Sequence, residues 1–200
     1  MVRRFIGGAL IATGAVLLLY CGVVTYQGWK LSHDSKRWLD SMLRQEQTKE
    51  RAAMKPPLRA RRAQRLPRNG ELLAQLEIPR LRLSVPVLEG VEDSDLRIAA
   101  GHIPGTAYPW TAGAGNIGIA AHRDRYFRPL KDIRRDDEIL LETPTGVRHY
   151  RVSGTEIVTP NDTRVLKPDG SEELTLVTCY PFYYVGSAPK RFIVHARQGS

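Results

Sequence analysis

Residues 174–181 read Leu-Thr-Leu-Val-Thr-Cys-Tyr-Pro, a β-branched and apolar run that a proline ends. Residues of these types favour a β-strand, and Pro181 stops the strand because proline has no N–H to donate to a ladder. Cys179 is therefore expected at the rim of a sheet. A strand cysteine is more often a small buried hydrophobic residue than a functional one, so its position alone leaves both interpretations open.

Runs of the same kind recur on the N-terminal and C-terminal sides of residues 174–181. Clusters of Pro, Gly and Asp separate them, as is typical of short strands joined by turns. The expected strands are Leu72–Ile78, Leu83–Val87, Asn116–Ala121, Glu138–Glu142, Val147–Val152, Glu156–Val158, Leu174–Cys179 and Arg191–Ala196. The expected helical turns are Asp93–Ala100 and Tyr126–Ile133. Eight strands between residues 70 and 200 predict an all-β barrel or sandwich with short helices.

Residues 5–26 contain no charged side chain. As a helix, this run would be about 33 Å long, which is enough to span the hydrocarbon core of a bilayer. Candidate interfacial residues flank it: Arg3, Arg4, Tyr26, Trp29 and Lys30. Residues 1–29 are therefore expected to form an uncleaved transmembrane signal-anchor. A cleaved signal peptide is the alternative, and positive charges on both sides leave the orientation of the helix undecided by charge.

Residues 30–69 are expected to form a juxtamembrane helix, ended by Pro56-Pro57, and then an arginine-rich linker. Residues 1–68 contain 14 Lys+Arg and 4 Asp+Glu, whereas residues 69–200 contain 16 and 17, in a chain of net charge +9. The folded domain, expected at 70–200, is thus nearly neutral. Because the basic charge lies in the N-terminal arm and no nucleic-acid-binding motif accompanies it, no nucleic-acid partner is expected.

His122 and Arg191 are also expected at strand ends. His122 follows the run 117–121, and Arg191 opens the last expected strand, which a hairpin would place beside Cys179. Neither residue is informative alone. Together the three supply what a thiolate nucleophile requires: positive charge nearby, a group that transfers protons, and a planar donor for an oxyanion.

Three motifs resemble those of the sortase family. Residues Thr175–Cys179, with Arg191 twelve positions later, are similar to the TLxTC…R signature of sortases. Residues Gly115–Asp124 resemble the histidine motif of the family, with Ala121 where a glycine is more common. The segment Gly101–Ala107 is similar to one in class D sortases. The chain therefore most resembles a class D sortase, over roughly residues 70–198.

The resemblance implies a closed eight-stranded sortase-type β-barrel and a cysteine transpeptidase. Cys179 would attack a backbone carbonyl in a C-terminal, LPxTG-like sorting motif of a secreted protein and form a thioester. His122 would transfer protons, and Arg191 would hold the oxyanion. An amine acceptor such as a cell-wall peptide would resolve the thioester, in cell-wall anchoring or pilin joining. The enzyme would be a single-pass protein of the cell membrane with an extracytoplasmic catalytic domain.

The resemblance also implies a sorting-signal pocket in the loop Thr159–Glu173. The expected substrate-binding residues are Ala120, Thr178, Thr159, Val165 and Leu166. No cofactor is expected, and no Cys/His spacing indicates zinc. Calcium could be held by Glu92, Asp93 and Asp95, although a solvated acidic turn is the commoner interpretation of such a segment.

Several alternatives remain open from the sequence. His102, in a Gly/Pro-rich loop, is a second candidate for proton transfer. Cys179 could simply be packed inside a membrane-tethered β-barrel binding module without catalysis. A different cysteine peptidase or an L,D-transpeptidase is also possible. However, the chain lacks the Ser-His-Gly-Cys context of the latter, and its histidine precedes its cysteine, the reverse of the papain-like order.

Overall fold

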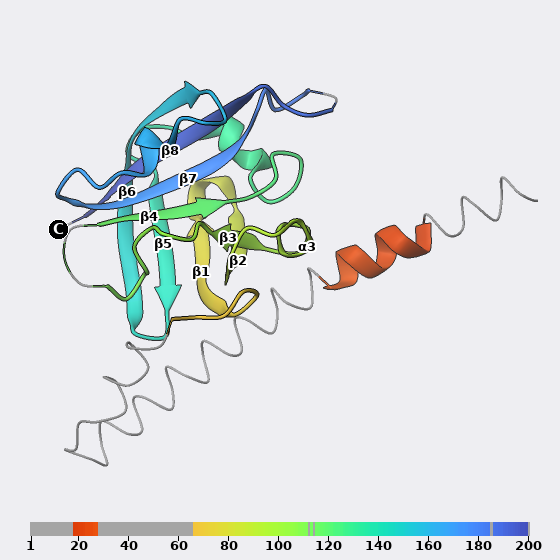
Figure 1. Cartoon of the computed structure of the whole chain (residues 1–200), viewed down its shortest axis with the longest axis horizontal. Helices are drawn as coiled ribbons and strands as arrows, with labels where there is room; N and C mark the ends of the chain where they lie inside the picture. The colour runs from red at the N-terminus through yellow and green to blue at the C-terminus, as the bar shows by residue number, and fades with distance from the viewer. Residues whose placement is uncertain (1–17, 28–65, 112, 114, 185, 200) are drawn as a thin grey trace, which may run out of the picture.

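The computed structural model describes residues 18–27, 66–111, 113, 115–184 and 186–199. Residues 18–27 form a helix, drawn in red-orange in Figure 1, and the later ranges form the folded domain. Within the described ranges, no helix is both long and apolar enough to cross a membrane. Much of the expected anchor, and nearly all of the expected juxtamembrane helix and linker, lie outside the described residues.

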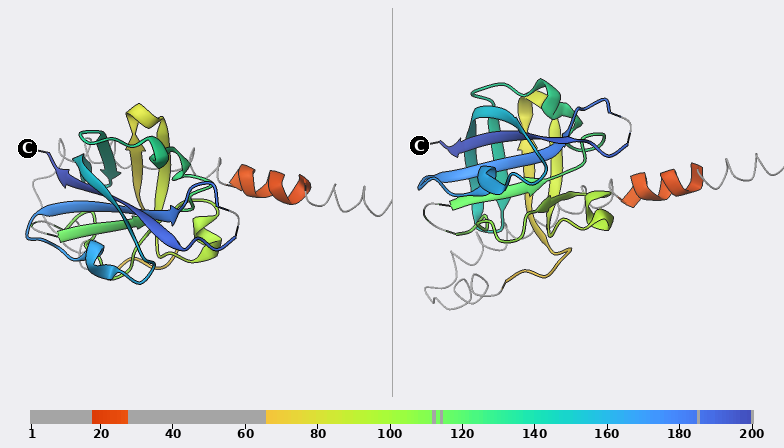
Figure 2. Two further views of the ribbon diagram at one scale, coloured as in Figure 1. Left: turned by 90° about the horizontal axis from the view of Figure 1, so that it is seen from above. Right: turned by 45° about the horizontal axis from the view of Figure 1, so that its top comes forward.

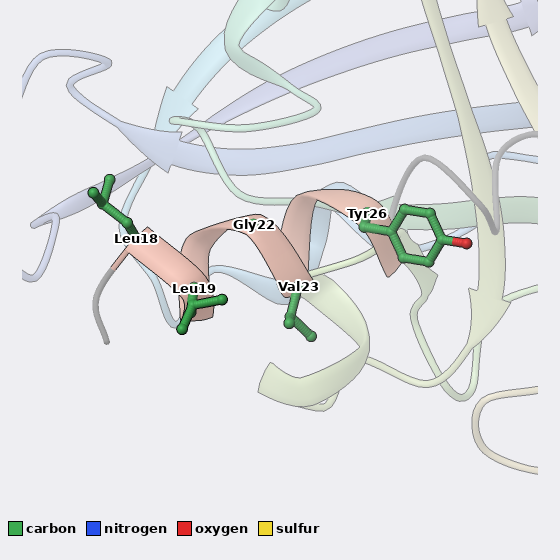
Figure 3. Close-up of a pocket in the computed structure, with 5 residues that line it drawn as sticks. All are labelled: Leu18, Leu19, Gly22, Val23 and Tyr26. Carbon is green, nitrogen blue, oxygen red and sulfur yellow. The ribbon is translucent and has the colours of Figure 1, made fainter. Parts of the chain in front are cut away.

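The helix at 18–27 exposes large apolar side chains. Leu18 and Leu19 are 75% and 70% exposed, and Figure 3 shows both on the helix with Val23 and Tyr26. Together with Gly22 these residues line a shallow hollow on the helix surface. Its lining includes no cysteine, histidine or carboxylate, so this hollow is not a candidate active site.

Eight strands build the folded domain. They are β1 (Leu72–Ile78), β2 (Leu83–Glu89), β3 (Ala100–His102), β4 (Gly115–Ala120), β5 (Glu138–Thr143), β6 (Gly146–Val158), β7 (Glu172–Tyr180) and β8 (Lys190–Gln198). They close into a barrel in the order β1-β2-β3-β4-β7-β8-β6-β5 (Figures 1 and 2). The pairs β2–β3 and β4–β7 are parallel, and the other pairs around the barrel are antiparallel. The expected closed eight-stranded all-β barrel is confirmed.

The observed strands differ from the expected strands at two places. Because one difference removes a strand and the other adds one, the total number of strands is unchanged. Residues 146–158 form one strand of 13 residues where the sequence predicted two, because a register shift between Val152 and Gly154 lets β6 continue past the glycine. In the other direction, β3 falls where a helical turn and a loop were predicted. Its three residues, Ala-Gly-His, contain no β-branched side chain to reveal a strand.

Short helical turns connect the strands. They are η1 (Pro79–Leu81), α3 (Asp93–Leu96), η2 (Arg128–Asp132) and η3 (Thr163–Leu166). The expected turn at 93–100 is helical only in its first half, and η2 lies within the expected turn at 126–133. The turn α3 connects β2 to β3, and η2 connects β4 to β5.

Inward-facing side chains fill the barrel. Fully buried members include Leu76, Ile119, Leu141, Leu174 and Leu176. Each such side chain contributes about 1.5–3 kcal/mol through the removal of apolar surface from water. Because neighbouring residues of a strand point to opposite faces, this core also fixes which residues of each strand face outward.

Gly101 lets β3 enter the barrel. A Cβ atom at this position would lie 2.2 Å from the carbonyl oxygen of Gly90 and 3.0 Å from Leu96 Cδ2. We expect Gly101→Ala to lower the free energy of unfolding by about 3 kcal/mol, because backbone must move to relieve the overlap. Chemical denaturation of the full chain in detergent would measure this loss.

Gly154→Ala is the matched control. Gly154 also lies in a strand of the barrel, yet a Cβ there would have no atom within 4 Å. The control variant should unfold within about 1 kcal/mol of the parent chain. Equal stability of the two variants would contradict the close approach of β3 to Gly90.

Candidate functional site

Cys179 and Arg191 lie opposite each other on neighbouring strands. They are direct partners in the antiparallel ladder of β7 and β8. Since Leu176 and Val194 of these strands point into the core, alternation places Cys179 and Arg191 on the outer face of the barrel. The hairpin expected from the sequence therefore places the thiol and the guanidinium on the same face of neighbouring strands.

His122 reaches the same edge through the parallel pairing of β4 with β7. Ala120 is the partner of Val177 in this ladder, so His122 and Cys179 each lie two residues beyond a matched pair. The main chain continues this alignment, because Ala121 N donates to Val177 O at 3.2 Å. Ile119 faces the core, which leaves Ala120 facing outward with Val177.

Thr178 supports the site from the inner side of β7. Its side chain is only 2% exposed, and its hydroxyl donates to Ala121 O at 2.7 Å. Thr178 is the ladder partner of Phe192, which packs against the core, so it faces away from Cys179 and Val177. The structure thus places Thr178 behind the expected groove and against the residue that precedes His122.

The exposure of the three side chains suits a reactive site. Cys179 is a free, half-buried thiol, and the His122 side chain is 33% exposed. Arg191 Nη1 donates to the carbonyl oxygens of Ala188 and Lys190 at 3.3 and 3.0 Å. A guanidinium has five N–H donors in one plane, so these two contacts leave others for a substrate.

The loop after β6 covers the outer face beside Cys179. Val165 of η3 is buried in a small apolar cluster with Val158 and Ile193, and Leu166 and Val177 pack against this cluster. The floor of the loop is polar: Asn116 Nδ2 donates to Val165 O at 3.2 Å. Of the residues predicted for the pocket, Leu166 lies near the outward face of β4 and Val165 lies beneath the loop.

Gly118 sets how closely this loop approaches β4. A Cβ at Gly118 would lie 3.1 Å from Leu166 Cδ2 and 3.0 Å from Thr106 Cγ2. Gly118 and Ala120 are outward-facing residues of one strand, and the side chains of Leu166 and Thr106 occupy the space that a Cβ at Gly118 would need. Thr159, the first residue after β6, is exposed, and its carbonyl accepts from Asp162 N at 3.1 Å.

A charged network fastens the loop to the barrel. Glu156 of β6 accepts from Arg164 Nη2 at 2.9 Å, and its other oxygen lies 2.9 Å from His195 Nε2 of β8. The hydrogen bond from Arg164, together with the smaller effect of His195, holds the pKa of Glu156 below its usual value. The carboxylate is therefore ionised at neutral pH and ties η3 to two strands.

His102, the alternative proton-transfer residue, lies in the barrel wall. Its side chain is 0% exposed, with Nδ1 at 2.8 Å from a Glu89 carboxylate oxygen. Its Nε2 lies 3.0 Å from both Ala107 O and the Thr106 hydroxyl. Both ring nitrogens are thus engaged in the interior, and the ring has no surface to offer a substrate.

The acidic turn considered for calcium has other partners. Asp93 pairs with Arg97, and Glu92 accepts from Asn69 Nδ2 at 3.0 Å. Among the described residues, no group of three or more His, Cys, Asp or Glu side chains is arranged to hold a metal ion. Instead, Asp93 Oδ1 lies 3.6 Å from His122 Nε2, a proximity that the sequence did not reveal.

A family model described as a Sortase domain matches residues 76–199. The chain belongs to the sortase family. Sortase D of Bacillus subtilis is 32% identical over 98% of this chain and 99% of its own length. Sortase SrtE1 of Streptomyces coelicolor is 31% identical over 90% of this chain and 53% of its own length.

Solved sortase structures share the fold. A Clostridium perfringens Sortase D5 transpeptidase matches this sortase with a TM-score of 0.62 and 26% identity, over 74% of this chain and 91% of its own. A lid mutant of Sortase A from Corynebacterium diphtheriae matches with a TM-score of 0.61 and 26% identity, over 69% and 74%. This sortase is therefore a cysteine transpeptidase, a class that acts on sorting-motif proteins and amine nucleophiles. The binding module and the other cysteine enzymes are set aside.

The charged network generates a prediction about the pocket loop. We expect Glu156→Gln to weaken binding of a sorting peptide by about two- to five-fold at pH 7, because each exposed ion pair contributes less than about 1 kcal/mol. A lowered carboxyl pKa stabilises the folded loop above the usual Glu value, and this contribution is lost as the pH falls through the lowered pKa. The difference between the parent chain and the variant should therefore shrink below about pH 4.

Fluorescence polarisation with a labelled sorting peptide would measure the dissociation constants, in a Cys179→Ala background that prevents turnover. Glu138→Gln is the matched control, because Glu138 also pairs with a histidine, His149, but on the ladder of β5 with β6. A dissociation constant unchanged by Glu156→Gln at pH 7 would show that the network does not hold the pocket.

Proposed function

We propose that this sortase cleaves a C-terminal, LPxTG-like sorting motif of secreted proteins and transfers the new carboxyl end to an amine of a cell-wall peptide. The observation that carries the proposal is the shared strand edge: Cys179 opposite Arg191, with His122 in register on the other side. A thiol, an imidazole and a guanidinium on one outward face are the groups that acyl transfer through a thioester requires.

In the first half-reaction, the thiolate of Cys179 attacks the backbone carbonyl carbon of the motif. The carbonyl oxygen becomes an oxyanion. Arg191 stabilises it with the N–H groups that are not bonded to Ala188 O and Lys190 O. The C–N bond then breaks, and protonated His122 gives its proton to the leaving amine. The products are a thioester on Cys179 and the released C-terminal peptide.

In the second half-reaction, the acceptor amine attacks the thioester carbon. His122 takes a proton from the attacking nitrogen, the C–S bond breaks, and the thiolate of Cys179 leaves. One amide bond has been exchanged for another, and the protons balance over the two steps. Neither half-reaction requires a cofactor.

The sorting motif would lie along the outer face between η3 and the β4 edge. Ala120, Val177 and Leu166 offer an apolar surface there, and Ala120 keeps the side chain on the outer face of β4 small. Thr159 and Val165 would act through the loop, Thr159 at its entrance and Val165 as its buried anchor. Thr178 would hold β4 and β7 together behind the groove.

Trapping of the acyl-enzyme tests the proposal. After the full chain in detergent is incubated with LPxTG-like peptides, we expect a mass increase on Cys179 equal to the N-terminal fragment of the peptide. An added cell-wall peptide amine should react with the thioester and give a ligated product. If only a lysine peptide from a pilin reacts, the proposed acceptor is wrong and the acceptor is a pilin amine. Intact-protein and peptide mass spectrometry measure each species.

Cys179→Ala is the control, because it keeps Cys21 as the chain's remaining thiol. This variant should form no adduct while it retains the circular dichroism of the parent. Arg191→Lys should form the adduct at least about 100-fold more slowly, since a point charge does not reproduce a planar fork of donors. A modified Cys21, or a parent chain that forms no thioester with any of the peptides, would overturn the assignment.

We also propose that residues 1–29 anchor the enzyme in the cell membrane and leave residues 70–200 outside the cytoplasm. The uncharged run 5–26 and the exposed leucines of the helix at 18–27 support the anchor. The enzyme would then meet secreted substrates where cell-wall amines are available.

Replacement of Leu18 and Leu19 by lysine should release the protein from membranes, because each central lysine costs about 3 kcal/mol of insertion free energy. Carbonate extraction of cell membranes, followed by blotting, would measure the released fraction. Leu66→Lys is the control, since Leu66 is also exposed but lies beyond the expected anchor. Carbonate release of the unsubstituted chain would contradict the anchor.

A further inference from the structure

Asp93 is fixed so that one carboxylate oxygen is turned toward His122. It is the first residue of α3, and its Oδ2 accepts from both Arg97 Nε at 3.1 Å and Arg97 Nη2 at 2.5 Å. The other oxygen, Oδ1, lies 3.6 Å from His122 Nε2. Arg97 therefore engages one oxygen and leaves the other directed at the imidazole.

The turn that carries Asp93 and the segment after His122 are joined by separate contacts. The Tyr126 hydroxyl donates to Ile98 O at 2.7 Å, and Arg125 Nη1 donates to Arg97 O at 3.1 Å. The main-chain N–H of Arg125 in turn donates to His122 O at 3.3 Å. These contacts hold the turn of Asp93 and the segment after His122 side by side.

We propose that Asp93 is a positioning residue for His122, one that orients the ring so that Nε2 carries a proton toward the carboxylate. Nδ1 then becomes the nitrogen that gives a proton to the leaving amine and takes one from the acceptor amine. The proposal rests on the proposed function, because it assigns an orientation to the histidine of that mechanism. Asp93 contacts the ring and need not touch the substrate.

The charge of Asp93 persists under working conditions. The hydrogen bond from Arg97 is the largest cause that holds the pKa of Asp93 below its usual value, and His122 adds a smaller effect. The sequence neighbours of His122 that carry charge are Arg123, Asp124 and Arg125, and Arg191 lies opposite Cys179 on β8. Among the described residues, Asp93 is the carboxylate that lies within 4.0 Å of the His122 ring.

The size of the effect depends on solvent. The Asp93 side chain is 67% exposed and the His122 side chain 33%, so in the free enzyme water weakens the pair. A bound sorting motif excludes part of this water, and the pair should strengthen when the proton must be held. We therefore expect the loss of Asp93 to appear more in kcat than in KM.

The Asp93→Asn variant of the full chain in detergent tests the proposal. It keeps the shape of the side chain but removes the charge, so kcat for acylation should fall by about two- to five-fold with KM nearly unchanged. In NMR spectra with labelled histidine, the fraction of neutral His122 rings that carry their proton on Nε2 should fall in the variant, because the carboxylate no longer favours that tautomer.

Asp95→Asn is the matched control, since Asp95 lies in the same turn, has the same charge and, among the described residues, forms no ion pair with His122. It should leave kcat and the His122 tautomer as in the parent. Asp93→Glu should restore both at least in part. A kcat and a tautomer unchanged in Asp93→Asn, in a protein that still forms the Cys179 thioester, would overturn the positioning role. Failure of the parent chain to form that thioester would instead overturn the proposed function.

Discussion

The parallel pairing of β4 with β7 is the constraint on which the site depends. Pairing of Ala120 with Val177 carries His122 to the level of Cys179, although the two residues are far apart in the sequence. A slip of one residue would turn His122 to the inner face, and a slip of two would move it by about 7 Å along the strand. The antiparallel ladder of β8 then places Arg191 directly opposite Cys179. Register thus brings the three residues to one edge of the barrel.

What preserves this register lies behind the reactive face. The Thr178 hydroxyl joins β7 to Ala121 within the barrel wall, next to the inward-facing leucines of the same strand. On the outer face, by contrast, the loop after β6 is held by one small apolar cluster and by the contacts of Glu156 with Arg164 and His195. The strand ends that carry Cys179 and His122 are therefore fixed by buried contacts, whereas the loop after β6 is held partly by contacts that solvent reaches.

Much of the barrel, and the positions of Cys179, His122 and Arg191 at strand ends, could be predicted from the sequence, because strands with β-branched runs and a terminal proline leave local signals. The short strand β3 left none: its position depends on the close approach of Gly101 to Gly90, which is a tertiary fact. The single strand β6 was divided in two because a bulge beside Gly154 interrupts the pattern without ending the pairing. The contact of Asp93 with His122 joins residues of two separate loops, and no hydrophobic periodicity in the sequence predicts a contact of this kind.

Two histidines, His102 at the end of β3 and His122 just after β4, show how the surroundings of a side chain affect what it can do. His102 and His122 each lie near a carboxylate, so a nearby acid does not distinguish them. Burial does: His102 has both nitrogens occupied and no exposed surface, and its bonds to Glu89 and the Thr106 loop hold β2, β3 and β4 together. His122 stands at an open edge, a third exposed, with one nitrogen facing Asp93 and the thiol strand beside it. The same pair of functional groups therefore serves as a structural link in the interior of the barrel, whereas at the rim it leaves an imidazole that solvent can reach.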